Sequence, residues 1–251
     1  MRRLSPGLTS AIDADYIANM LVNQPPGTVP VAVPMAPWAL SGTVLGVLMN
    51  HRPALAALGD AVRQPPYKAP PQAPVLYLKP RNTWVASGGV VPVPPDAPEL
   101  ELGACLAAVI GRPARGVAAA EARHHIAGWL LVADVCVPHA VYYRPSLRWR
   151  VRDGFCPLGP EVVPRAAVAA PEDLTIAVEV DGVPVHEAPC GDRLRDIATL
   201  IADVSAFMTL HAGDLLMLGT AHGAPRVRAG QRVRLSAPGL VPLEVGFEAE
   251  S

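Results

Sequence analysis

One aspartate of this chain stands where an unpaired carboxylate would be very costly. Asp134 lies in the run of residues 130–135, which is otherwise apolar and has the composition of a buried strand. An isolated charge in such surroundings loses its hydration without compensation, so it must be paired, hydrogen-bonded or bound to a metal. The position therefore predicts either a buried ion pair or a metal ligand.

Four arginines follow this run closely. Arg144 and Arg152 bracket Arg148 and Arg150, and all four lie within one short segment. Cations gathered from three segments of the chain, these arginines among them, would suit a dicarboxylate substrate, because a guanidinium offers two parallel donors to one carboxylate. The alternation of Arg148, Arg150 and Arg152 also fits an exposed strand whose arginines face water. Both interpretations stay open at this point.

The elements that must position these residues are short and mostly strands. Short apolar runs bounded by Pro and Gly indicate strands, and Asp181-Gly182 is typical of a two-residue hairpin turn. Strands are expected at residues 43–48, 75–78, 104–110, 129–137, 174–180, 215–218, 233–235 and 240–245. Helices are expected at residues 54–63, 118–126 and 192–210, and residues 64–74 are expected to form a loop. The pattern indicates an α+β fold that is rich in short strands.

Composition and charge exclude several classes of protein. The chain has 251 residues, 51% of them hydrophobic and 17% charged, which indicates a well-buried globular protein. Its net charge is -1 and it has no basic block, so nucleic acid is a poor candidate partner. Residues 16–50 carry no charge, but prolines interrupt them, and no clean apolar stretch of about 20 residues remains to cross a membrane.

The cysteines and the N-terminus indicate location and domain organisation. The 4 cysteines form no C-x-x-C pair, so buried free thiols in a reducing cytoplasm are the favoured interpretation. The basic start is a poor signal peptide, because Asp13 and Asp15 interrupt the run behind it. Residues 1–41 are expected to be an irregular, dispensable extension, and residues 42–251 one domain.

The order of several short motifs resembles the fumarylacetoacetate hydrolase family. The matching segments are residues 77–82 (Tyr-Leu-Lys-Pro-Arg-Asn), 104–111 (Ala-Cys-Leu-Ala-Ala-Val-Ile-Gly), 133–135 (Ala-Asp-Val) and 153–160 (Asp-Gly-Phe-Cys-Pro-Leu-Gly-Pro). Members of that family are metal-dependent enzymes that act on oxo-acids. The resemblance implies a β-rich fold of short strands, in roll- or barrel-like sheets with a few helices.

The resemblance also identifies a metal site that is largely missing. Family members hold Mg²⁺ or Mn²⁺ with two Glu residues at i and i+2 and a third carboxylate, which matches Asp134. Gly103 and Cys105 stand at the positions of the two Glu residues. Hard divalent cations need several oxygen ligands, so binding to this chain alone is expected to be weak or absent. Glu99 and Glu101, four residues earlier, could replace the pair only through a bulge, and a solvated strand entrance is the favoured interpretation.

The segment that carries the family's acid–base residues is altered too. Asn50 matches a family Asn and His51 a family Tyr, while Ala54 and Ala57 replace a His and a Glu that act together on water. Alanine cannot transfer protons, so water-driven C–C hydrolysis is not expected. His51 could act as a stand-in, but a loop histidine bonded to backbone is favoured.

Three polar residues survive at positions that the resemblance assigns to substrate binding. Lys79 matches a family Lys, Arg150 stands where a second Lys often lies, and Thr220 belongs to a Gly-Thr pair that lines the pocket. The resemblance implies that these three residues bind an oxo-acid with two or three carboxylates. It identifies no catalytic residue.

Further motifs are similar to the N-terminal half of two-part members of the family. Residues 50–52, 66–71, 79–83, 143–145 and 152–157 carry this likeness. Such members decarboxylate 5-oxopent-3-ene-1,2,5-tricarboxylate and isomerise 2-hydroxyhepta-2,4-diene-1,7-dioate during 4-hydroxyphenylacetate (homoprotocatechuate) breakdown. The resemblance therefore implies a decarboxylase/isomerase subunit that forms a homo-oligomer or pairs with a sister subunit. The alternative is a non-catalytic partner that supports a metal-bearing sister subunit.

Overall fold

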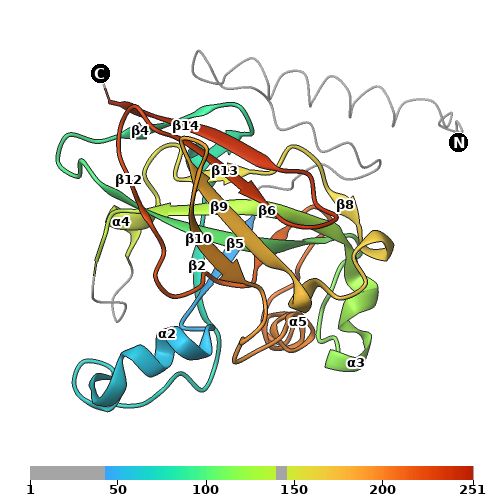
Figure 1. Cartoon of the computed structure of the whole chain (residues 1–251). Helices are drawn as coiled ribbons and strands as arrows, with labels where there is room; N and C mark the ends of the chain where they lie inside the picture. The colour runs from blue at the N-terminus through green and yellow to red at the C-terminus, as the bar shows by residue number, and fades with distance from the viewer. Residues whose placement is uncertain (1–42, 140–145, 251) are drawn as a thin grey trace, which may run out of the picture.

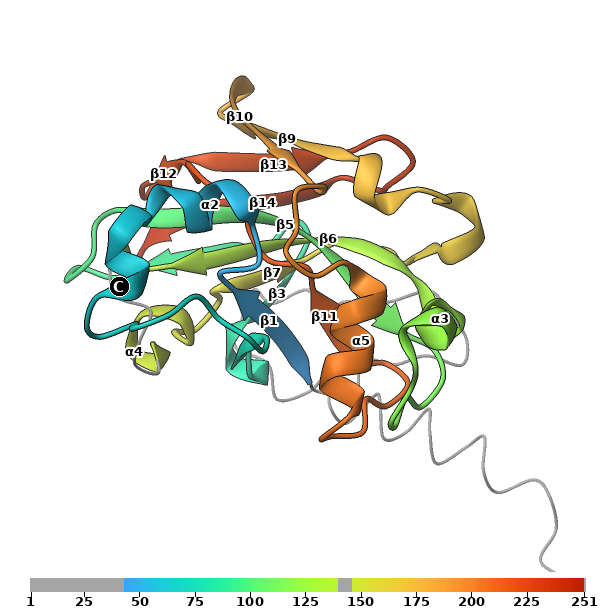
Figure 2. The same cartoon turned by 90° about the horizontal axis from the view of Figure 1, so that it is seen from below.

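Two β-sheets packed face to face make up the body of the protein (Figure 1). The computed structural model describes residues 43–139 and 146–250. Figure 2 shows the smaller sheet lying across one face of the larger sheet, with α2, α3 and α5 grouped around the larger sheet. The α+β class and the predominance of short strands are confirmed.

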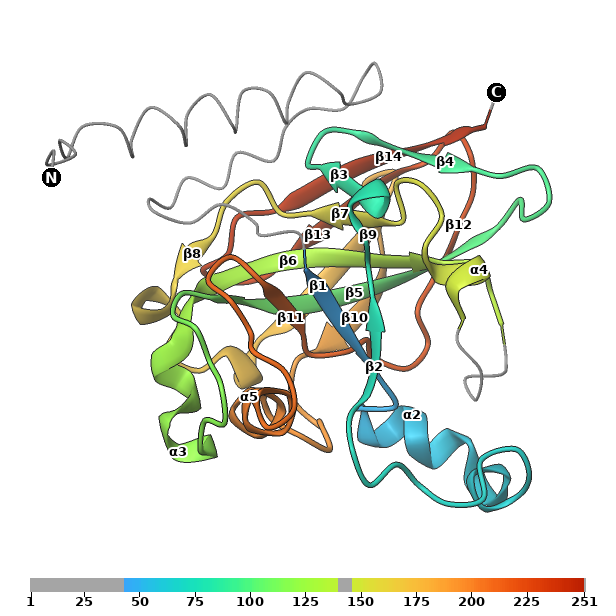
Figure 3. The same cartoon turned by 180° about the vertical axis from the view of Figure 1, so that it is seen from behind.

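The larger sheet curls because its two end strands are nearly adjacent in the chain. Its strands run in the order β2-β1-β11-β5-β6-β7-β3, with β12 beside β5 and β8 beside β6. Residues 79–83 alone join β2 to β3, so the two ends must approach each other (Figure 3). The strands are β1 (Val44–Leu48), β2 (Val75–Leu78), β3 (Trp84–Ala86), β5 (Leu100–Ile110), β6 (Ile126–Cys136), β7 (Cys156–Leu158), β8 (Val163–Pro164), β11 (Leu215–Met217) and β12 (Arg226–Val227).

The smaller sheet contains the expected hairpin. Its order is β10-β9-β13-β14-β4, with strands β4 (Val90–Val93), β9 (Thr175–Val180), β10 (Val183–Pro189), β13 (Arg232–Ser236) and β14 (Leu243–Ala249). Asp181 and Gly182 join β9 to β10 with φ of 52° and 78°. Positive φ at both turn residues matches the twist of the flanking strands, so this prediction is confirmed.

The central pair β5–β6 separates two apolar layers. Successive side chains of a strand point to opposite faces. One face packs against the smaller sheet and α5 and contains residues such as Leu102, Leu106 and Leu131. The other face lies inside the curl, where Cys105 and Val132 belong to a second cluster. Asp134 follows Val132 by two residues, so it points into the curl as well.

The predicted helices are shorter than expected. The helix expected at 54–63 is α2 (Arg52–Ala57) followed by a 3-10 turn (Gly59–Arg63), because Gly59 has a φ of 51°. The helix expected at 118–126 is α3 (Ala119–Ala122) followed by a 3-10 turn (Arg123–His125). The part of the chain that the structure describes also contains a short helix, α4 (Leu147–Arg150), and 3-10 turns at Arg81–Thr83, Arg165–Ala167 and Pro171–Asp173.

The helix expected at 192–210 is the clearest correction, since it spans only α5 (Ile197–Ser205). Asp192 has a φ of 55°, which no helix accepts, and Arg193 forms a β-bridge with His51. Asp196 then caps the helix, its carboxylate accepting from Thr199 N at 2.8 Å. The apolar spacing therefore predicted helix before Asp196, where none forms.

Other expectations fall partly outside this description. The extension at residues 1–41 lies outside the described residues, and its extent and dispensability stay predictions. All four cysteines are buried free thiols, as expected. Among the helices of the described residues, none is long and apolar enough to cross a membrane.

Candidate functional site

Asp134 is the centre of a buried ionic cluster inside the curl. Lys79 Nζ lies 2.8 Å from Asp134 Oδ1, and Arg150 Nη1 lies 2.9 Å from Oδ2. The Tyr77 hydroxyl also donates to Oδ2, at 2.5 Å. Lys79, Asp134 and Arg150 are only 0%, 2% and 5% exposed. Of the two sequence interpretations for Asp134, the structure has the buried ion pair.

Lys79 connects three separate segments of the chain to this cluster through hydrogen bonds. Its ammonium donates to the carbonyls of Val135, Arg150 and Phe155, at 2.8, 2.7 and 2.9 Å. An ammonium has three protons, so these bonds use all of them. Asp134 Oδ1 therefore lies beside the positive charge of Lys79 but accepts no hydrogen bond from the described residues. Lys79 thus joins the end of β6, the end of α4 and the segment before β7.

Arg150 decides between the two interpretations of the arginine segment. It ends the helix α4 rather than lying on a strand, and its guanidinium stacks over the Tyr77 ring at 4.9 Å from the centroid. The exposed-strand interpretation is therefore wrong for Arg150. Arg152 does lie at the surface, where it pairs with Asp96 at 2.6 Å. Arg144 lies outside the described residues.

The surroundings keep Asp134 ionised and Tyr77 protonated. Burial alone would raise the pKa of Asp134, but the charges of Lys79 and Arg150 outweigh it and hold this pKa below its usual value. Burial and the neighbouring Asp134 carboxylate raise the pKa of the Tyr77 hydroxyl well above its usual value. Tyr77 therefore remains a proton donor at neutral pH.

The Gly-Thr pair of residues 219–220 packs against Gly103 and Cys105, the positions that the resemblance assigns to the family's two Glu residues. Gly103 lies directly opposite Asp134 across β5 and β6. A Cβ on Gly103 would come within 2.3 Å of the Thr220 methyl group. The Cys105 thiol donates to Gly219 O at 3.3 Å, and burial raises its pKa to about 12. Cys105 is consequently a neutral thiol, not an anionic ligand.

These residues do not fit a divalent metal. A hard cation needs several oxygen ligands, and within the described residues no cluster of three acidic, His or Cys side chains provides them. Both Asp134 oxygens already face a cation or the Tyr77 hydroxyl. A metal ion beside them would meet the positive charges of Lys79 and Arg150.

The earlier acidic pair does not supply the missing ligands. Glu99 pairs with Arg228, and Glu101 lies 3.4 Å from Arg226. Both arginines belong to the strand β12 or the segment just after it. The favoured interpretation of Glu99 and Glu101 as a solvated strand entrance matches this placement.

Asn50 and His51 have structural bonds at the start of α2. Asn50 Nδ2 donates to Leu218 O at 3.0 Å and to Arg195 O at 2.9 Å. His51 Nδ1 accepts from the backbone N–H of Ala54 and of His222, at 3.3 and 3.2 Å. The favoured interpretation of His51 as a histidine bonded to backbone agrees with this geometry.

Sequence reasoning missed Tyr77 as a member of the cluster. Tyr77 and Lys79 are two residues apart at the end of β2, and alternation along a strand puts such side chains on one face. That spacing was the available signal. The partner that lets Tyr77 reach Asp134 is Gly46, which is its register neighbour on β1.

Gly46 provides a testable consequence. A Cβ on Gly46 would lie 2.1 Å from the Tyr77 ring, so Gly46→Ala is expected to displace the ring from Asp134 and to destabilise the protein by about 1–3 kcal/mol. Gly246→Ala on β14 is the matched control, because its Cβ would meet nothing closer than 3.7 Å. Urea unfolding of both variants measures the difference. Equal stability of the two variants would contradict this account of Gly46.

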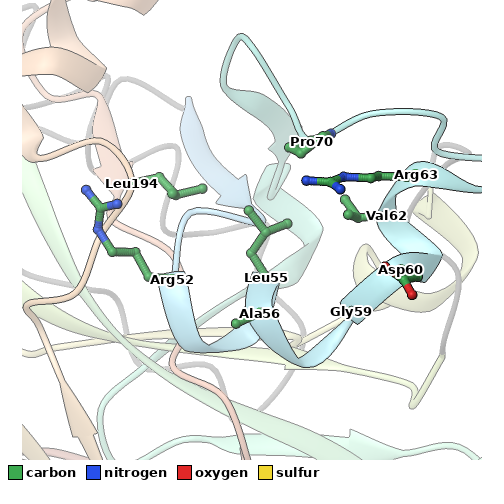
Figure 4. Close-up of a pocket in the computed structure, with 9 residues that line it drawn as sticks. All are labelled: Arg52, Leu55, Ala56, Gly59, Asp60, Val62, Arg63, Pro70 and Leu194. Atoms are coloured by element: carbon green, nitrogen blue, oxygen red, sulfur yellow. The ribbon is translucent and has the colours of Figure 1, made fainter.

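A surface hollow away from the cluster has a volume of about 360 Å³. It lies between α2, the turn after it and Leu194 (Figure 4). Arg52, Asp60 and Arg63 give it charged walls. None of Lys79, Asp134, Arg150 or Thr220 lines it.

The arrangement of a curled sheet covered by a second sheet is found in solved structures of other proteins. The fumarylpyruvate hydrolase of Pseudomonas aeruginosa, solved in complex with Mn²⁺ and pyruvate, superposes with a TM-score of 0.73 over 90% of this chain and 98% of that chain. Their sequences are 22% identical, so this likeness concerns the fold alone.

Residues 43–247 match the family described as fumarylacetoacetate (FAA) hydrolase, C-terminal, and the chain belongs to the fumarylacetoacetate hydrolase family. It is 39% identical over 205 residues to the 4-hydroxyphenylacetate degradation bifunctional isomerase/decarboxylase of Escherichia coli. That match covers 82% of this chain and 47% of the relative, so the chain spans about half the relative's length. It is also 32% identical to a mitochondrial oxaloacetate tautomerase of Arabidopsis thaliana, over 80% of this chain and 87% of the relative.

Proposed function

We propose that the chain is a subunit of a decarboxylase/isomerase that acts on oxo-acids with two or three carboxylates, and that Lys79, Arg150 and Thr220 contribute to its substrate site. The charge of the buried cluster carries this proposal. The ionised side chains of Lys79, Arg150 and Asp134 sum to one positive charge, at the place where the resemblance to the family implies a metal. A buried positive charge favours an anionic ligand or an anionic transition state.

Decarboxylation of such a substrate develops a negative charge that this cluster would stabilise. When a carboxylate β to a carbonyl is lost, the C–C bond to it breaks and its electron pair forms an enolate while CO₂ leaves. A proton returned to carbon then gives the ketone. Arg150 would stabilise the enolate oxygen, and the protonated Tyr77 hydroxyl lies beside the same cluster. Isomerisation or tautomerisation of a 2-hydroxy-dienoate passes through a similar enolate, so one cationic site could serve these reactions.

The names of the relatives support the substrate class. The relative from Escherichia coli is named for isomerase and decarboxylase activity in 4-hydroxyphenylacetate degradation. The substrates proposed here are accordingly 5-oxopent-3-ene-1,2,5-tricarboxylate and 2-hydroxyhepta-2,4-diene-1,7-dioate. The cytoplasm is the proposed location, and the four buried free thiols are compatible with it.

Turnover of the tricarboxylate by the purified chain tests this function. We expect CO₂ release by the wild-type chain, alone or with a sister subunit, and a loss of at least about tenfold in Arg150→Met. Arg152→Met is the matched control, because Arg152 pairs with Asp96 at the surface. Unchanged turnover in Arg150→Met would overturn the assignment of Arg150.

The second candidate is a non-catalytic partner of a metal-bearing sister subunit. One observation favours it: all three protons of Lys79 are already used on backbone carbonyls. A lysine held in this way stabilises the fold and has no donor to spare. If the chain releases no CO₂ alone, and Arg150→Met raises the turnover of the sister subunit as much as the wild-type chain does, this second function holds and the first fails.

Association with another subunit is part of both functions. Phe207 is 67% exposed and Leu78 is 51% exposed, and both are large apolar side chains. The chain also spans only about half of its bifunctional relative. Sedimentation velocity of the chain, alone and mixed with a sister chain, tests for a homo-oligomer or a heteromeric complex. A monomer under both conditions would contradict the proposal.

A further inference from the structure

Two neighbouring residues outside the Asp134 cluster bury donor groups that find no acceptor among residues 43–139 and 146–250. Arg193 is 8% exposed and His51 is 4% exposed. Arg193 Nε and Nη1 and His51 Nε2 are buried without a hydrogen-bond partner among the described residues. Arg193 makes one side-chain hydrogen bond there, from Nη2 to Pro189 O at 3.2 Å. Buried donors are normally satisfied, so three such atoms in two adjacent side chains call for an explanation.

The backbone places these two side chains together. His51 and Arg193 face each other in an antiparallel β-bridge. The flanking bonds, Arg52 N to Asp192 O at 2.8 Å and Leu194 N to Asn50 O at 2.9 Å, make the pair a non-hydrogen-bonded one. Side chains of such a pair lie on the same side, with Cβ atoms about 4.5–5.5 Å apart. The free donors therefore belong to one small region.

The hydrogen bonds of His51 fix which nitrogen carries the proton. Nδ1 accepts from two backbone N–H groups, Ala54 N and His222 N, so it has no proton of its own. The proton of the neutral ring is then on Nε2, which is a donor. Burial, followed by the charge of Arg193, lowers the pKa of His51, so the ring is neutral at pH 7.

Arg193 brings a positive charge that no acidic side chain neutralises at close range. Within the described part of the chain, no carboxylate forms an ion pair with it. Asp192 acts on it only at longer range, and the buried thiols of Cys105 and Cys190 remain neutral with pKa values of about 12 and 11. A buried guanidinium without a counter-ion is costly. An anion is the missing partner.

This region adjoins the proposed substrate site. Of the charges that act on Cys105, Arg193 has the largest effect, and the Cys105 thiol bonds to Gly219 O at 3.3 Å. Gly219 precedes Thr220, whose methyl group packs against Gly103 opposite Asp134. Cys105, Gly219 and Thr220 thus connect the region of Arg193 to the Asp134 cluster.

We propose that Arg193 and His51 form a carboxylate-binding subsite, which holds the non-reacting carboxylate of a dicarboxylate ligand while its other end faces Arg150. This inference rests on the proposed function for the ligand class. The subsite is buried in this structure. The helix α2, which starts directly after His51, is the neighbouring element that can move, because none of its residues is buried. An element with so little buried surface opens at low cost.

Calorimetric titration of the full chain with succinate and with glutarate tests the subsite. We expect wild-type binding, and at least about tenfold weaker binding in Arg193→Met, which corresponds to 1.4 kcal/mol or more. The diamide of the same acid should not bind. Arg52→Met is the matched control, since Arg52 is the neighbouring arginine but lines the separate hollow of Figure 4.

Stability separates a binding role from a structural one. Because Arg193→Met removes an unpaired buried charge, its melting temperature should be equal to or above that of the wild type. Absence of binding by both acids, equal binding by Arg193→Met, or a melting temperature lowered in step with the lost affinity would each overturn the subsite. A chain that binds glutarate through Arg193 but releases no CO₂ from the tricarboxylate would keep the subsite and lose the proposed activity.

Discussion

Replacement of Asp134 by alanine is expected to lower the free energy of unfolding by about 3–5 kcal/mol. The substitution leaves the Lys79 ammonium and the Arg150 guanidinium in the interior without their common carboxylate. Both cations are almost completely buried, so water cannot replace the lost partner. Urea unfolding at neutral pH measures the effect through the transition midpoint and slope.

Two controls test whether the loss of stability comes from the unpaired buried cations. Asp96→Ala removes the carboxylate of a surface pair with Arg152, and the unfolding midpoint should barely change because both partners are screened by water. In the second control, Lys79→Met and Arg150→Met are added to Asp134→Ala. Removing the whole ionic cluster should recover much of the loss, since a buried pair replaced by apolar groups is often neutral. A loss below about 1 kcal/mol in Asp134→Ala would show that the cluster is not held as described.

The sequence alone predicted that Asp134 needs a partner, but it could not predict which one. The apolar run around Asp134 makes the cost of a lone carboxylate visible without any structure. The partners Lys79 and Arg150 come from segments 55 and 16 residues away in the chain, and only the curl of the sheet brings them together. Arg150 also lies on a short helix, so the alternation of arginines suggested a misleading strand.

Two of the errors in helix length have the same local cause. Gly59 and Asp192 both adopt positive φ, which ends or forbids a helix at a point where the apolar spacing continues. Such a conformation is common for glycine but uncommon for aspartate. Nothing in the sequence therefore indicated that the helix could not include Asp192. The same break lets Arg193 pair with His51 rather than continue the helix. For that reason the proposed subsite was not predicted from the sequence.

Restoring the family's two Glu residues is expected not to restore metal binding by itself. In Gly103→Glu with Cys105→Glu, the Cβ at position 103 would lie 2.3 Å from the Thr220 methyl group. The variant should therefore be less stable than the wild type. Asp134 would still face Lys79 at 2.8 Å and Arg150 at 2.9 Å, so a divalent ion would meet two cations. Titration with Mn²⁺ should show no stoichiometric micromolar site in either the wild-type chain or this variant.

Binding should appear only when the competing groups are removed as well. Adding Thr220→Gly and Lys79→Met to the two Glu substitutions clears the methyl group and frees Asp134 Oδ1, which leaves three carboxylates for one ion. Micromolar Mn²⁺ binding by this variant, abolished by a further Asp134→Ala, is the expected result, and the Mn²⁺ electron paramagnetic resonance signal reports it directly. A stoichiometric Mn²⁺ site in the wild-type chain that Asp134→Ala removes would instead show that Lys79 and Arg150 yield to a metal. Charge exclusion by these two cations would then have no part in the chemistry of this protein.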